Sequence, residues 1–139
     1  MKTIIFSILF SLMFLTPMSK LSLAAEPVCA IGNETEFREE IKTLKAEFLI
    51  AKPVALEKAL ALVNKNRANS GKHLIQADRL ILGVFVNPSK NALMVGYAFF
   101  KDGCLVPGAV GAMPAVIFAD FVSQAKIDFE KDFIEERSS

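Results

Sequence analysis

The sequence holds 139 residues, 53% of them hydrophobic, with 16 lysine and arginine residues against 15 aspartate and glutamate residues. This near-neutral balance creates no broad electrostatic field that would attract nucleic acid, and the length suits one hydrophobic core. We therefore expect a single domain with no nucleic-acid partner.

The first 25 residues have the order of features typical of an export signal. Lys2 supplies a positive charge, an apolar run follows at positions 4–15, and small residues precede position 26. The run is shorter than the roughly 20 apolar residues that a spanning helix needs. The sequence therefore predicts a cleavable signal peptide at residues 1–25 and a mature domain at residues 26–139. We expect export to a periplasm or to the medium, with no stable membrane insertion after cleavage.

Cys29 and Cys104 are the two cysteines of the chain. Thiols of exported proteins tend to pair in an oxidising compartment, so we expect a disulfide between them. It would close a loop of about 75 residues and stabilise the fold by about 4 kcal/mol on the chain-entropy model. It would also tie the N-terminal lead-in to the predicted sheet.

The N-terminal half of the mature chain has helical periodicity. Asn33 and Glu36 form a capping-box pattern, and apolar residues then recur at helical spacing as far as Phe48. This pattern predicts a first helix from residue 33 to about residue 51. Pro53 suits the first turn of a second helix, whose apolar stripe ends at an asparagine-rich segment. We expect these two N-terminal helices to form a hairpin that packs on a flat surface.

The middle of the chain predicts strands. Residues 80–86 form a short apolar run rich in branched side chains, and residues 92–100 form a second run after a turn segment. Residues 104–106 follow a tight turn at Asp102 and Gly103, which adds a third strand. The spacing predicts a three-stranded antiparallel meander. We expect the small-residue stretch 107–114 to be a loop.

The last third of the chain predicts a C-terminal helix. Pro114 suits its first position, and apolar residues keep helical spacing to about Ala125. The charged tail at residues 126–139 is expected to be a fraying helix end. Positions 105–119 carry no charge, but prolines and glycines interrupt them, which favours burial in the domain over a membrane span. The fold class expected is α+β: two N-terminal helices, a three-stranded antiparallel meander and a C-terminal helix, with the helices on one sheet face.

The sequence offers one candidate catalytic pair and no metal site. A thiol-dependent hydrolase would use Cys104 as the nucleophile beside His73, but a disulfide at Cys104 would remove the thiolate. One histidine and two distant cysteines are too few for zinc. Asp128, Glu130 and Asp132 diverge around a helix, which favours a solvated acidic face over a calcium site. We therefore expect no catalytic residues, no metal and no cofactor.

Three aromatic residues are candidate contacts for a partner. Phe129 and Phe133 lie among charges near the end of the chain, and Tyr97 lies on the central strand, where it is either buried or exposed. An exposed sheet edge would also accept an extended peptide, and the sequence does not show which strand lies at the edge.

The leading hypothesis is an exported, small, non-enzymatic binding or accessory protein that acts through contact with a protein partner. Two alternatives stay open. One is the thiol-dependent hydrolase. The other is a carrier of apolar ligands, with a pocket between the helices and the sheet. The sequence identifies neither the partner nor the oligomeric state.

Overall fold

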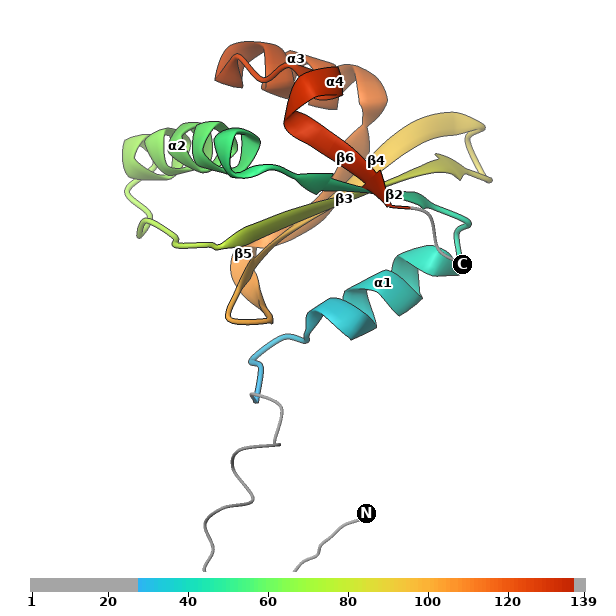
Figure 1. Ribbon diagram of the computed structural model, residues 1–139, viewed down its shortest axis with the longest axis horizontal. Helices are drawn as coiled ribbons and strands as arrows, with labels where there is room; N and C mark the ends of the chain where they lie inside the picture. The colour runs from blue at the N-terminus through green and yellow to red at the C-terminus, as the bar shows by residue number, and fades with distance from the viewer. Residues whose placement is uncertain (1–27, 137–139) are drawn as a thin grey trace, which may run out of the picture.

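The computed structural model describes residues 28–136 (Figure 1), so the predicted signal peptide lies outside the described residues. The elements follow one another in the order α1 (Glu34–Lys42), β2 (Glu47–Ala51), α2 (Pro53–Asn69), β3 (Arg79–Asn87), β4 (Ala92–Lys101), β5 (Cys104–Pro114), α3 (Ala115–Ala125), α4 (Phe129–Asp132) and β6 (Phe133–Glu136). None of the helices in this range is long and apolar enough to cross a membrane.

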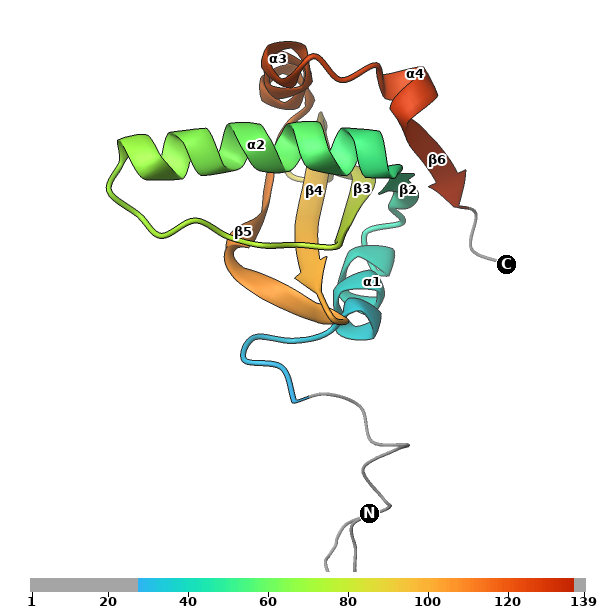
Figure 2. The same ribbon diagram turned by 60° about the vertical axis from the view of Figure 1, so that its left-hand side comes forward.

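The strands form one five-stranded antiparallel sheet in the order β5-β4-β3-β2-β6. Helix α2 runs across the strands with α3 beside it, and α1 packs on the opposite face (Figure 2). The prediction of a three-stranded meander with all helices on one face is therefore wrong. The α+β content is confirmed.

The first helix is shorter than predicted, and a strand follows it. The capping box is confirmed, because the side chains of Asn33 and Glu36 each accept the other residue's backbone N–H at 2.9 Å. Helix α1 then ends at Lys42, and Lys45 turns the chain with a φ of 58°. Phe48 still enters the core, but from strand β2, which pairs with β3 and β6. The expected hairpin of two N-terminal helices is wrong, since β2 separates α1 from α2.

The C-terminal tail contains a strand rather than a fraying helix. Helix α3 ends at Ala125, where Lys126 adopts the left-handed conformation with a φ of 59°. The Asp128 side chain then caps the short helix α4. Strand β6 follows and pairs antiparallel with β2 along its whole length. The tail therefore supplies the fifth strand.

Strand β5 is longer than predicted, because it includes the stretch expected to be a loop. Ala98 on β4 pairs with Val110, whereas Phe100 pairs with Leu105. Residues 106–109 therefore bulge opposite Phe99 alone. The strand resumes after the bulge and continues to Pro114.

Two hydrophobic clusters, one on each sheet face, form the core. The larger cluster joins α2 and α3 to the sheet, and the smaller one joins α1 to it. Helix α1 approaches the sheet closely over Gly83, where an added Cβ would lie only 2.7 Å from Cγ2 of Ile41. The α1 face is therefore packed tightly at its centre.

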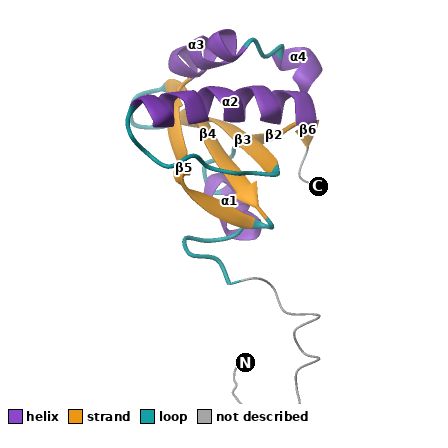
Figure 3. Cartoon of the chain, turned by 90° about the vertical axis from the view of Figure 1, so that its left-hand side faces the viewer, coloured by secondary structure: helices purple, strands orange, loops and turns teal. Residues whose placement is uncertain are grey.

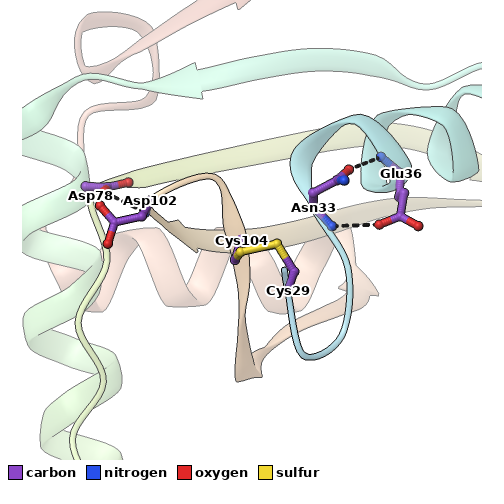
Figure 4. Close-up of a disulfide and its surroundings, with 6 residues drawn as sticks. All are labelled: Cys29, Asn33, Glu36, Asp78, Asp102 and Cys104. Carbon is purple, nitrogen blue, oxygen red and sulfur yellow. Dashed lines mark hydrogen bonds between the residues drawn. A yellow bond between two sulfur atoms is a disulfide. The ribbon is translucent and has the colours of Figure 1, made fainter. Parts of the chain in front are cut away.

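The structure brings Cys29 and Cys104 to disulfide distance, as the sequence predicts, with an S–S length of 2.04 Å (Figure 4). The bond joins the N-terminal lead-in to the first residue of β5. Beside it, the Leu105 N–H donates to the Gly32 carbonyl at 3.0 Å, and Asn33 forms a β-bridge with Cys104. The lead-in thus covers the beginning of the β5 edge.

Candidate functional site

The candidate catalytic pair lacks a thiolate in this structure. Cys104 is bonded to Cys29, and the described part of the chain has no free cysteine. His73 lies exposed in the loop after α2, where its carbonyl accepts a hydrogen bond from Nε of Arg67 at 2.6 Å. A thiol-dependent reaction would first require reduction of the disulfide.

The acidic residues near α4 bind the chain itself. The Asp128 side chain accepts the Lys131 backbone N–H at 3.2 Å, and the Asp132 side chain accepts the Asp128 backbone N–H at 2.9 Å. Lys58 of α2 lies 3.7 Å from the Asp132 carboxylate. Between residues 28 and 136, no group of three metal-ligating side chains converges.

The three aromatic residues expected as partner contacts occupy different environments. Phe129 is 40% exposed, whereas Phe133 is 5% exposed, and the two rings lie 4.9 Å apart. Phe118 of α3 joins them, with its ring centroid 5.8 Å from that of Phe129. Tyr97 is half-buried under the helices on the larger cluster's side. Phe129 is thus the most accessible of the three.

A cavity of about 80 Å³ lies between the sheet and helices α2 and α3. Its wall includes Val63, Leu82, Tyr97, Met113, Phe118 and Phe133. Tyr97 carries the one polar side-chain group among all the residues that line it. This cavity lies where an apolar-ligand carrier would need its pocket.

An open groove of about 300 Å³ lies on the other sheet face, beside α1. Helix α1 contributes Phe37, Glu40 and Leu44 to it, and the sheet contributes Phe85, Val110 and Ala112. The groove reaches β5 and therefore lies next to the edge of the sheet. Its lining is apolar apart from the carboxylate of Glu40 and the backbone.

The two edges of the sheet are formed by β5 and β6 (Figure 3). In the described residues, no strand pairs with the outer edge of β5 from Val106 to Pro114. Val110 is 37% exposed there, and Ala112 and Pro114 are also exposed. No charged residue stands anywhere in β5.

The sequence contained a signal for this edge strand that the loop prediction passed over. Proline within a strand is found at sheet edges, at strand ends and at bulges, because it has no N–H to donate. Pro107 falls in the bulge and Pro114 at the end of β5. Between them, Val110 and Ala112 are exposed while Ala109 is buried, which is the alternation of a strand.

By its fold, the chain is a disulfide-linked α+β protein with a five-stranded antiparallel sheet and helices on both faces. No family model matches it, no curated protein matches its sequence, and no solved structure matches its fold. A function is therefore inferred from the chain's own geometry.

Proposed function

We propose that this chain is a small, exported, non-enzymatic binding protein that contacts a protein partner through the outer edge of β5. The observation that carries the proposal is the accessible edge from Val106 to Pro114, which no described strand covers. Edge strands present N–H and C=O groups that pair with an extended segment of another chain. The partner would then add a strand to the sheet.

The groove beside α1 supports the proposal, because it lies next to the same edge. Backbone pairing gives an added strand affinity, and pockets for its alternate side chains give specificity. Side chains that point toward the α1 face would lie beside Val110 and Ala112, which line the groove. We expect a partner segment with apolar side chains at alternate positions.

The opposite edge is less suited to a partner. Strand β6 has four residues, and its last two are glutamates. Arg38 of α1 forms an ion pair with Glu136, which ties this edge to the helix. A short charged edge resists the pairing that a long neutral one accepts.

Two observations support the exported location. The first 25 residues have the charge, apolar run and small residues of a signal peptide. The Cys29–Cys104 disulfide is compatible with an oxidising compartment, where such bonds persist.

A charge placed on the β5 edge tests the proposed contact. The tagged chain is isolated from its native compartment, its partner is identified, and binding is measured with both purified proteins. Ala112→Lys introduces a charge at the exposed edge and should weaken binding at least tenfold. Ala61→Lys on the exposed side of α2 is the matched control and should bind like the wild type. Equal affinity of both variants would contradict the β5 edge as the contact.

A thiol count separates the binding protein from the thiol-dependent hydrolase. We expect no reactive thiol in the native mature protein and two after reduction, because both cysteines are in the disulfide. Two reactive thiols in the native protein, together with hydrolase turnover that Cys104→Ser abolishes, would favour the hydrolase.

A further inference from the structure

We propose that the cavity between the sheet and helices α2 and α3 binds a compact apolar molecule that carries one hydrogen-bond acceptor. The cavity lies on the face opposite the α1 groove, so this site does not depend on the β5 edge. It gives the chain a small-molecule site in addition to the proposed protein contact.

The volume of the cavity sets the size of the ligand. Protein interiors are close-packed and contain few voids larger than a water molecule. The cavity measures about 80 Å³, whereas a water needs only about 10–15 Å³ and an engineered cavity of about 150 Å³ binds benzene. We therefore infer a ligand larger than water and smaller than benzene.

The wall of the cavity sets the polarity of the ligand. The sheet contributes Leu80, Leu82 and Phe99, and the helical side contributes Ala59, Phe118 and Phe121. No charged side chain lines the cavity. An ion would lose its hydration there without gaining a partner, which excludes charged ligands, whereas an apolar body loses little.

The Tyr97 hydroxyl sets the position of the acceptor. A Cβ at position 111 would lie 2.9 Å from this hydroxyl oxygen, so Gly111 on the neighbouring strand leaves the group its space. No other group between residues 28 and 136 forms a hydrogen bond with the Tyr97 side chain. The hydroxyl can therefore donate to a ligand that enters the cavity.

Xenon tests whether the cavity admits a compact apolar body. In NMR spectra of the mature protein under xenon, we expect shift changes at the methyl groups of Leu82 and Ile127, which line the cavity. The Leu105 methyls, which pack under α1, should not respond. Absence of shift changes at the cavity methyls would overturn the site.

Two variants of α2 provide a matched comparison for the xenon experiment. Val63→Phe places a ring in the cavity and should abolish the shift changes, whereas Val54→Phe changes a half-exposed residue outside the cavity and should preserve them. If Val63→Phe does not fold, the wild-type shift map alone decides, since it locates the bound xenon.

A pair of isosteric probes tests the hydrogen-bond acceptor. Acetone and isobutene have the same shape, but acetone carries a carbonyl oxygen. Tyr97→Phe should weaken acetone binding by about three- to tenfold, the size expected for one neutral hydrogen bond, and leave isobutene binding unchanged. An equal change for both probes, or none for acetone, would overturn the acceptor. Neither result affects the β5 edge, whose test uses Ala112→Lys.

Discussion

The two edges of the sheet are closed in different ways. Strand β6 is short, anchored by the buried side chain of Phe133, and tied to α1 by the pair of Arg38 and Glu136. Strand β5 is more than twice as long, and its outer edge is covered only at its beginning, where the disulfide holds the lead-in. Side chains of the domain itself secure one edge, while most of the other is left to a partner.

Removal of the β6 anchor should have the largest effect. Phe133 is 5% exposed, so Phe133→Ala should lower the free energy of unfolding by about 3–5 kcal/mol, the usual cost of deleting a buried phenylalanine ring. Urea denaturation measures the loss. Ile134→Ala on the same strand is the control, because this residue is 50% exposed and should cost less than about 1 kcal/mol. Similar losses for both variants would show that Phe133 does not anchor the edge.

Removal of the disulfide should uncover the rest of the β5 edge. We expect the double variant Cys29→Ser, Cys104→Ser to lose about 2–4 kcal/mol of the free energy of unfolding. The Leu105 amide, which donates to Gly32, should also exchange its hydrogen faster. Hydrogen exchange followed by mass spectrometry or NMR measures this. Unchanged protection of Leu105 would mean that the lead-in stays in place without the bond.

Loss of the Arg38 side chain should loosen the β6 edge only slightly. The guanidinium pairs with Glu34 at 3.0 Å and with Glu136, and it lies 5.2 Å from the centre of the Phe48 ring. These contacts are partly exposed, so Arg38→Ala should cost about 1 kcal/mol in urea denaturation. Lys42→Ala on the same helix should stay within about 0.5 kcal/mol of the wild type. A larger cost for Lys42→Ala would contradict the role of Arg38.

A charge on the β5 edge should have the smallest effect on folding. Ala112 is exposed, so Ala112→Lys should change the free energy of unfolding by no more than about 0.5 kcal/mol. Thermal denaturation beside the wild type checks this. A large loss of stability would mean that the weakened partner binding expected of this variant reflects misfolding.

The sequence predicted the local features of the fold well. The capping box at Asn33, the proline that starts α2 and the hairpin between β3 and β4 depend on residues close together in the chain, and all three are confirmed. The disulfide was also predictable, because the chain has two cysteines and an apparent export signal.

The errors all concern pairing between distant segments. Strands β2 and β6 lie more than 80 residues apart and pair with each other. Residues 47–51 continue a helical spacing of apolar residues, and residues 133–136 lie in a charged tail, so neither segment indicates the other. Bulk periodicity also could not show that the proline- and glycine-rich residues after position 106 resume β5 as an edge strand.

The same limit explains what was missed at the candidate sites. The spacing of Phe118, Phe129 and Phe133 suggested one helical stripe, but the structure divides it between α3, α4 and β6. The cavity arises because this aromatic group covers the sheet face from three separate elements. Such a space depends on tertiary packing, which no local pattern encodes.

Cross-linking from the two edges in the native compartment tests the binding account most directly. A photoreactive amino acid is placed at Ala112 on the β5 edge in one variant and at Ile134 on β6 in another, both exposed positions. We predict a cross-link to one protein partner from Ala112 and none to that partner from Ile134. Cross-links to the same partner from Ile134, with none from Ala112, would contradict the β5 edge as the site of contact.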